Sequence, residues 1–103
     1  MKYISTRDAS LRYTAAQAIA QGLSRDGGLF LPESIPQLDG AALEELAQLS
    51  YVERAVRVMK LYLDEFTQDE LREYAQKAYG AAKFDTPDVA PLTQLDDATS
   101  VLE

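Results

Sequence analysis

Residues 50–80 read SYVERAVRVMKLYLDEFTQDELREYAQKAYG and carry the strongest helix signals in the chain. Ser50 and Glu53 have the spacing of a capping box, and so do Thr67 and Glu70, so each pair predicts the start of a helix. Apolar residues recur at helical spacing after both starts. They are Val52, Ala55, Val56, Met59, Leu63 and Phe66 in the first helix, and Leu71, Tyr74, Ala75, Ala78 and Tyr79 in the second. The stretch therefore predicts two consecutive amphipathic helices.

Further signals bound these helices and predict two more upstream. Phe66 can pack on Leu71 as a hydrophobic staple, and Gly80 is expected to end the last helix. Thr14 and Gln17 form another capping box, with Gly22 placed to close the helix that follows. Asp39 is expected to cap a helix that runs to about residue 49. The expected inward positions of these two upstream helices are Ala15, Ala18, Ile19 and Leu23, and Leu43, Leu46 and Ala47.

Short extended segments lie at both ends of the chain. Residues 3–6 predict a strand that pairs near residues 29–31, which follow a turn at Asp26-Gly27-Gly28 and end at Pro32. Beyond Gly80 the helical periodicity is lost, and an extended segment is expected to lie across other surfaces; the last residues, 100–103, are typical of the start of a strand. We expect an α+β fold, mostly helical, with about four helices packed on one side of short N-terminal strands. Residues 1–103 are taken as one domain with a radius of gyration of about 13 Å.

Composition excludes several classes of function. The chain has 103 residues, no Cys and no His, which removes disulfides, thiolate and imidazole metal ligands, and Cys or Ser–His nucleophiles. Net charge is −7, and residues 39–103 carry 6 basic against 14 acidic side chains. We expect no nucleic-acid or membrane partner, because both would need a basic stripe. A cytoplasmic protein is expected, since no basic-then-apolar leader or membrane-length apolar run is present.

A few polar clusters are candidates for a binding, metal or catalytic site. Ser5-Thr6-Arg7 suits an oxyanion or the carboxylate of another domain, although Arg7 is also interpretable as a surface or ion-paired residue. Asp26-Gly27-Gly28 is interpreted as a plain turn, because no helix follows it to complete a phosphate loop. Two acidic groups, Asp69/Glu70/Glu73 and Asp96/Asp97, lack the pattern of a calcium loop. The lysines, which are Lys2, Lys60, Lys77 and Lys83, lie among polar residues rather than in an apolar pocket. We therefore assign no catalytic, cofactor-binding or metal-binding residue.

Five segments, taken in order, resemble the start of bacterial threonine synthases. They are residues 3–7, 22–33, 49–51, 89–92 and 101–103. The most specific is Gly-Leu-x-x-Asp-Gly-Gly-Leu-Phe-Leu-Pro-Glu at 22–33, which places two turn signals and a proline in one order around a short apolar run. Asp8 departs from the pattern, because the family usually has glycine after Ser-Thr-Arg. The resemblance spans the whole chain.

The resemblance implies the N-terminal domain of a pyridoxal-phosphate enzyme of fold type II, the tryptophan-synthase-β-like type. Such an enzyme converts O-phospho-L-homoserine and water to L-threonine and phosphate, with the cofactor as electron sink. The family's cofactor lysine lies in a His-Gly-Pro-Thr and Phe-Lys-Asp stretch that does not occur in these residues. The chain alone is thus expected to bind no pyridoxal phosphate, to be inactive, and to pack on the missing catalytic domains of its own chain. Self-association through the exposed interface is a further expectation.

The sequence is compatible with two alternatives. The chain is either a domain fragment of this enzyme or a self-contained acidic helical module that binds a partner protein. A fragment should expose a large apolar patch, whereas a self-sufficient module should be mostly polar on its surface. Autonomous catalysis with pyridoxal phosphate would require one of the four lysines and is not expected. Whether Arg7 or the turn at residues 26–28 touches substrate in a full enzyme is left undecided.

Overall fold

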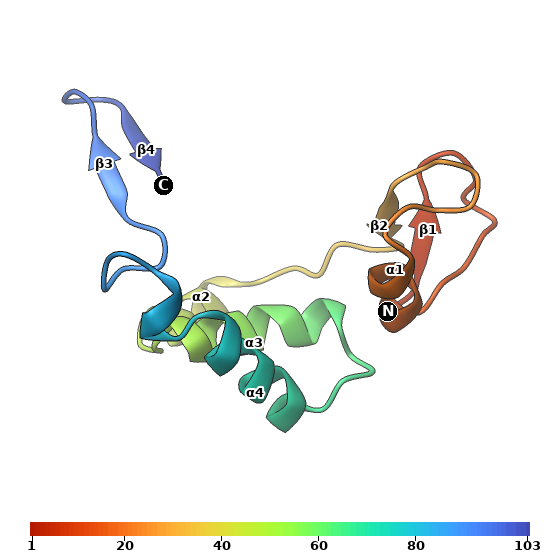
Figure 1. Cartoon of the computed structure of the whole chain (residues 1–103), viewed down its shortest axis with the longest axis horizontal. Helices are drawn as coiled ribbons and strands as arrows, with labels where there is room; N and C mark the ends of the chain where they lie inside the picture. The colour runs from red at the N-terminus through yellow and green to blue at the C-terminus, as the bar shows by residue number, and fades with distance from the viewer.

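The chain folds into three parts that follow one another along the sequence (Figure 1). The computed structural model describes residues 1–103, except for the side chain of Ala81. The N-terminal unit consists of β1 (Tyr3–Ser5), α1 (Ala15–Gln21) and β2 (Phe30–Pro32). The helical unit consists of α2 (Gly40–Ala47), α3 (Tyr51–Tyr62) and α4 (Gln68–Ala78). The C-terminal arm consists of the 3₁₀ turn η1 (Ala81–Lys83), β3 (Leu92–Gln94) and β4 (Ser100–Leu102).

A two-stranded antiparallel sheet organises the N-terminal unit. β1 pairs with β2, with Ile4 opposite Leu31 and Tyr3 opposite Pro32. Pro32 is the last residue of β2, where a missing N–H costs the ladder least. The predicted pairing of the N-terminal strand with the segment after the turn is confirmed, displaced by one residue.

The predicted boundaries of α1 are confirmed, but half of its predicted inward face is wrong. Thr14 and Gln17 form both bonds of the capping box, and Gly22 closes the helix at a φ of 79°. Ala15 and Ala18 are buried as expected. Ile19, however, is 65% exposed, and Leu23 is exposed as well. Ile19 faces an open hollow that α3 and α4 also line, and no side chain of these residues fills it.

Helices α3 and α4 form the core of the molecule. Val56, Leu71 and Ala75 are buried there, and Phe66 packs against them as the predicted staple residue. The capping box of Thr67 and Glu70 is complete. These contacts hold α4 antiparallel to α3 as a hairpin of two helices.

The capping box predicted at the start of α3 is only half formed. The Ser50 hydroxyl accepts the Glu53 N–H, but the Glu53 carboxylate turns away from the cap. It binds Arg72 of α4 instead, with 2.7 Å between Oε1 and Nε. A bidentate guanidinium–carboxylate pair is stronger than the bond that a neutral backbone N–H of the cap residue would donate to the same carboxylate. The carboxylate therefore binds Arg72 in preference to the cap.

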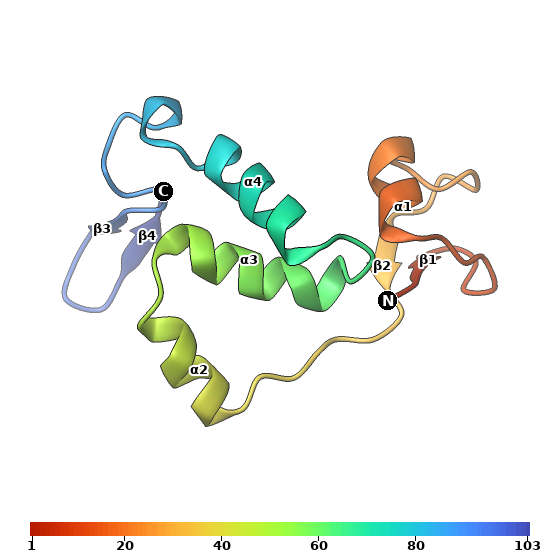
Figure 2. The same ribbon diagram turned by 90° about the horizontal axis from the view of Figure 1, so that it is seen from below.

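Helix α2 covers α3 less fully than its apolar stripe predicted. Asp39 caps it, as expected, by accepting the Ala42 N–H. Leu46 is half-buried, but Leu43 and Ala47 are exposed. Figure 2 shows α2 diverging from α3 at one end, while α1 stands apart with the N-terminal unit. The expectation that four helices pack together on one side is therefore wrong, although the α+β class with four helices and short strands is confirmed.

The C-terminal arm leaves the helices instead of lying across them (Figure 1). Helix α4 ends at Ala78 with Tyr79 as its C-cap, and not at Gly80 as predicted. Gly80 has a φ of −66° and precedes η1 as its N-cap. The predicted strand at the end of the chain is confirmed as β4, and it forms a hairpin with β3 that was not predicted. All six strand residues of the hairpin are exposed.

Three polar contacts join the N-terminal unit to the end of α3 and the loop that follows it. The Tyr3 hydroxyl donates to the Tyr62 carbonyl at 2.9 Å, the N-terminal ammonium pairs with Asp64, and the Ala16 N–H donates to Glu65. Burial and nearby carboxylates raise the pKa of Tyr3. The two units are therefore held at one edge, with an open side between them.

The overall shape is wide for the chain length. The radius of gyration is 16.5 Å, against about 13 Å for a self-contained domain of this length. The accessible surface is 7459 Å², where a folded monomer of this mass exposes about 5,800 Å². In the part of the chain that the structure describes, no helix has the length and hydropathy to cross a bilayer.

Candidate docking surface

The two polar motifs singled out from the sequence meet in the N-terminal unit. The Ser5 hydroxyl lies 2.8 Å from both carboxylate oxygens of Asp26, and the Gly28 N–H donates to the same carboxylate at 2.9 Å. Arg7 Nη1 donates to the Asp26 carbonyl at 3.0 Å. The hydroxyl of Thr6 accepts the Leu29 N–H. The motifs thus bind each other and secure the turn beside the sheet.

Gly28 is required at this turn because the space beside it is filled. A Cβ at this position would lie 2.2 Å from the Ser5 oxygen and 3.0 Å from oxygens of Thr6 and Asp26. We predict that Gly28→Ala destabilises the chain by about 1–3 kcal/mol. Gly40→Ala is the matched control, since a Cβ at Gly40 meets no atom within 4 Å. Urea unfolding of both variants measures the difference, and equal midpoints would contradict the prediction.

Asp26 makes the stability of this turn depend on pH. The Gly28 N–H and then the Ser5 hydroxyl lower the pKa of Asp26. A carboxylate whose folded-state pKa is depressed stabilises the fold above its unfolded pKa, about 3.9, and this stabilisation is lost as the pH falls through the folded value. We predict a flatter dependence of the urea midpoint on pH between about 7 and about 3 for Asp26→Asn than for the unchanged chain. Parallel curves would show that Asp26 does not act this way.

The lysines do not fit the aldehyde of pyridoxal phosphate. Lys60 Nζ donates to the carbonyls of Asp64 and Phe66, closing the end of α3. Glu73 holds the pKa of Lys77 above its ordinary value by a hydrogen bond and by its charge. A Schiff-base lysine needs the opposite, a depressed pKa in a desolvated pocket. Lys2 and Lys83 are exposed.

The glycine turn at residues 26–28 is not arranged to bind the phosphate group of pyridoxal phosphate either. Gly27 and Gly28 lead into β2 and not into the N-terminus of a helix. The Gly28 N–H is already bound to Asp26. The residues described here therefore do not fit pyridoxal phosphate.

The carboxylates of the acidic clusters already bind groups of neighbouring residues. Asp69 pairs with Arg72, and Glu73 pairs with Lys77. Glu70 accepts the Thr67 N–H, which lowers the pKa of Glu70. Asp96 accepts the N–H groups of Ala98 and Thr99, with the same effect on its pKa. Across the described residues, no three Asp or Glu side chains are placed to hold a metal ion.

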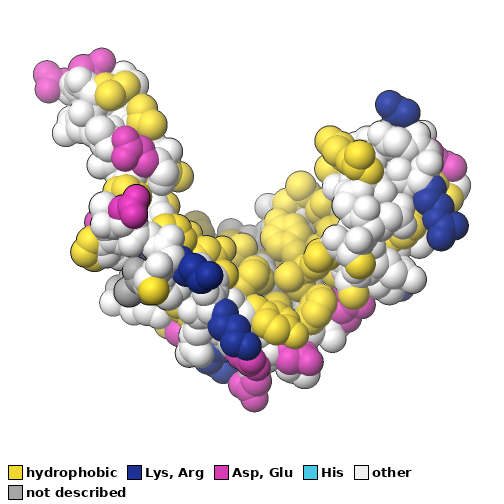
Figure 3. Space-filling model, viewed as in Figure 1, with side chains coloured by type: hydrophobic (Ala, Val, Ile, Leu, Met, Phe, Trp, Pro, Cys, Tyr) yellow, Lys and Arg dark blue, Asp and Glu magenta, His cyan; other side chains and the backbone are white. Residues whose placement is uncertain are grey.

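A broad apolar surface lies between the N-terminal unit and the helical unit. One hollow of about 400 Å³ and another of about 370 Å³ share Ile19 and Leu63 in their walls. We call this surface the apolar trough and define it by Ile19, Leu29, Met59, Leu63, Phe66 and Tyr74. Figure 3 shows hydrophobic side chains gathered at the base of the hollow, over the helices and beside the N-terminal unit.

Exposure in the trough explains why the predicted inward positions Ile19 and Tyr74 are not buried. Ile19 is 65% exposed and Tyr74 is 49% exposed, although both lie on the apolar face of their helix. The charged strip of α3 lies elsewhere, at Glu53, Arg57 and Lys60, which helical periodicity places in one row. Glu53 and Arg57 of that row are bound to Arg72 and Glu45. Apolar and charged side chains are thus segregated, as they are on an element that buries one face.

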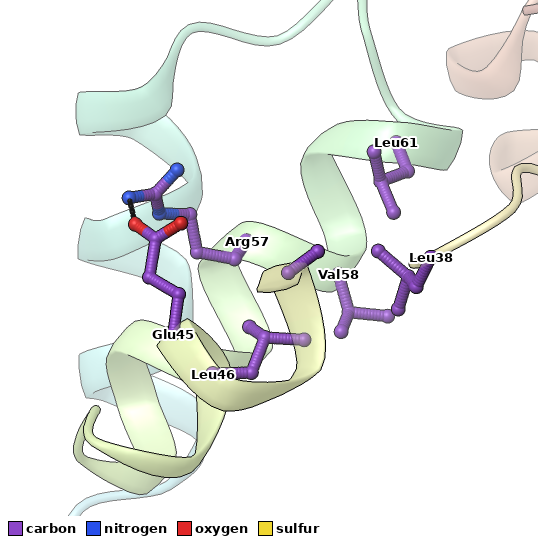
Figure 4. Close-up of a pocket in the computed structure, with 7 residues that line it drawn as sticks. Leu38, Glu45, Leu46, Arg57, Val58 and Leu61 are labelled. Carbon is purple, nitrogen blue, oxygen red and sulfur yellow. Dashed lines mark hydrogen bonds and ion pairs between the residues drawn. The ribbon is translucent and has the colours of Figure 1, made fainter. Parts of the chain in front are cut away.

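A second, smaller groove lies between α2 and α3 (Figure 4). It has a volume of about 200 Å³, and its apolar walls are Leu38, Ala42, Leu46, Val58 and Leu61. The ion pair between Glu45 and Arg57 borders it. Because α2 buries none of its described side chains fully, this groove marks the loosest packing in the helical unit.

Comparison with known proteins identifies a family and longer relatives to which this chain is similar. Residues 2–79 match the family described as threonine synthase N terminus. The chain is 37% identical over 105 residues to the threonine synthase of Schizosaccharomyces pombe, covering 100% of this chain and 20% of that protein. It is 39% identical over 102 residues to the enzyme of Corynebacterium glutamicum, covering 94% of this chain and 21% of the relative.

A solved structure shares the whole arrangement. The crystal structure of PLP-bound threonine synthase from Brucella melitensis matches with a TM-score of 0.86 and 36% identity, covering 100% of this chain and 22% of that one. The chain therefore spans about a fifth of the length of the proteins it matches. The open shape is thus one that also occurs inside a much longer chain. Sequence and structure agree that this chain belongs to the threonine synthase N-terminal family.

Proposed function

We propose that residues 1–103 are the N-terminal domain of a threonine synthase and serve as a cap on its catalytic domains. Those domains would bind pyridoxal phosphate and convert O-phospho-L-homoserine and water to L-threonine and phosphate. The apolar trough is the surface that docks on them. The observation that carries the proposal is the exposure of this trough in a chain that otherwise has ordinary helix caps and a packed core.

The area of uncovered surface fits this role. The chain exposes about 1,700 Å² more than a self-contained monomer of its mass. A standard protein interface takes about 800 Å² from each partner. The excess is therefore enough for an extensive permanent contact between domains, and the match to a longer solved chain supports a contact within one polypeptide.

Catalysis is assigned to residues outside this chain. The four lysines and the glycine turn are engaged or placed in ways that do not suit the cofactor, and Ser5, Arg7 and Asp26 bind one another. We assign the chain no catalytic, cofactor-binding or metal-binding residue. A cytoplasmic location is part of the proposal.

The apolar trough also weighs against the self-contained interaction module. Such a module would be mostly polar on its surface, whereas this chain leaves large apolar side chains of α1, α3 and α4 open to solvent. In the absence of the other domains, the same trough is expected to drive self-association. Light scattering should then show a mass that rises with the concentration of the isolated chain.

The proposal is tested by exchanging domains. The N-terminal region of the Corynebacterium glutamicum enzyme is deleted or replaced by residues 1–103, and phosphate release from O-phospho-L-homoserine is measured with pyridoxal phosphate present. We expect no activity from residues 1–103 alone, none or little from the deleted enzyme, and restored activity in the fusion. Turnover by the isolated chain, or a fusion no more active than the deleted enzyme, would refute the proposal.

A further inference from the structure

The hairpin of β3 and β4 is set apart from the rest of the chain. It projects away from the helices (Figure 1), and its strands pair with each other. Leu92 is 73% exposed and Leu102 is 67% exposed. The family match ends at residue 79, so the hairpin lies outside the segment that defines the N-terminal family.

The hydrogen bonds of the hairpin show which main-chain groups point outward. The Leu95 N–H donates to the Thr99 carbonyl at 2.9 Å, and the Glu103 N–H donates to the Pro91 carbonyl at 3.0 Å. Antiparallel strands alternate between residues that face the partner strand and residues that face away. The outward N–H and C=O groups therefore belong to Leu92 and Gln94 on β3, and to Ser100 and Leu102 on β4.

Both faces of the hairpin carry residues typical of a covered sheet. Leu92 lies opposite Leu102 on one face, and Thr93 lies opposite Val101 on the other. A two-stranded hairpin with strands of three residues is marginal in water by itself. Unpaired edge groups attract a further strand unless charge or proline protects them. None of the outward residues on either strand is charged or proline, so both edges of the hairpin are open and chain order has to decide between them.

We infer that the outer edge of β4 is a site of strand addition. Its occupant is a strand of the segment that follows residue 103 in the longer protein, and this inference rests on the proposed function. The proteins that this chain matches are about five times as long. The residue after β4, Glu103, still donates its N–H to Pro91 of the hairpin, so under the proposed function the longer chain continues directly from β4. Strands that follow each other in sequence are neighbours in a sheet about two-thirds of the time.

Amide hydrogen exchange tests the edge directly. Exchange is measured residue by residue in the isolated chain and in the fusion with the Corynebacterium glutamicum domains. The amides of Ser100 and Leu102 should exchange at least about 100-fold more slowly in the fusion, because a partner strand would then accept their hydrogen bonds. The amide of Gln94, on the opposite edge, serves as the internal control and should change little. Unchanged exchange at Ser100 and Leu102, or protection of Gln94 instead, would overturn the inference.

A matched pair of proline variants gives a second readout. Ser100→Pro removes one outward N–H from β4, and Gln94→Pro removes one from β3. Only Ser100→Pro should lower the melting temperature and the activity of the fusion, and equal losses would contradict the assignment to β4. A fusion that is active but shows no protection at Ser100 refutes the strand addition alone. A fusion that is inactive while Ser100 is protected refutes the proposed function alone.

Discussion

Replacing Leu71 with alanine is expected to unfold the helical unit at temperatures where the unchanged chain is folded. Leu71 is 2% exposed and, with Val56 and Ala75, forms the buried centre between α3 and α4. Removing such a side chain costs about 2–5 kcal/mol. Small domains have only about 5–15 kcal/mol of stability in total. We expect the melting temperature, followed by circular dichroism, to fall by about 10 °C or more.

The matched control for this prediction is Leu92→Ala. It removes the same atoms from a side chain that is 73% exposed, so the isolated chain should melt within about 2 °C of the unchanged protein. If both variants melted at the same temperature, the core would not lie where α3 and α4 meet.

Placing a charge in the apolar trough should have little effect on the stability of the isolated chain but should strongly reduce the activity of the enzyme fusion. Ile19 is largely exposed in the isolated chain, so Ile19→Asp should leave its melting temperature nearly unchanged and reduce its self-association. In the fusion, the same carboxylate would be buried without a partner, which costs several kcal/mol. We expect activity of the fusion to fall at least about 100-fold, a loss that corresponds to about 2.7 kcal/mol.

Ile35→Asp is the matched control for the trough. Ile35 is 67% exposed, nearly the same as Ile19, but it lies in the linker between β2 and α2 and outside the trough. It should leave the activity of the fusion within about threefold of the unchanged sequence. Equal losses in both variants would mean that the trough is not the docking surface. Phosphate release and light scattering measure the two effects separately.

Local features of this fold were predictable because neighbouring residues determine them. Thr14 with Gln17, and Thr67 with Glu70, form capping boxes, and Gly22 takes the positive φ expected of a closing glycine. Ser50 shows the limit of such prediction. Its box is half formed because Arg72, 19 residues from Glu53, competes for the carboxylate.

The candidate sites were predictable only as separate pieces. Residues 5–7 and residues 26–28 were both identified as polar motifs, yet nothing local indicates that the Ser5 hydroxyl binds Asp26 across 21 positions. The docking surface was expected only as an apolar patch of a domain fragment, and its residues were not identified. Its signal was present in the apolar spacing of Ile19 and Tyr74, which was assigned to a core inside the chain.

By itself, the amino-acid sequence determined where helices begin and end, the turn at Asp26, the family, and which faces are apolar. Only the tertiary structure decided which of those faces meet each other: Val56 and Leu71 close a core, while Ile19 and Tyr74 remain open. The physical reason is that hydrophobic periodicity records that a face is removed from water, whereas the partner that removes it depends on contacts between distant segments. In this chain, we propose, that partner lies outside residues 1–103.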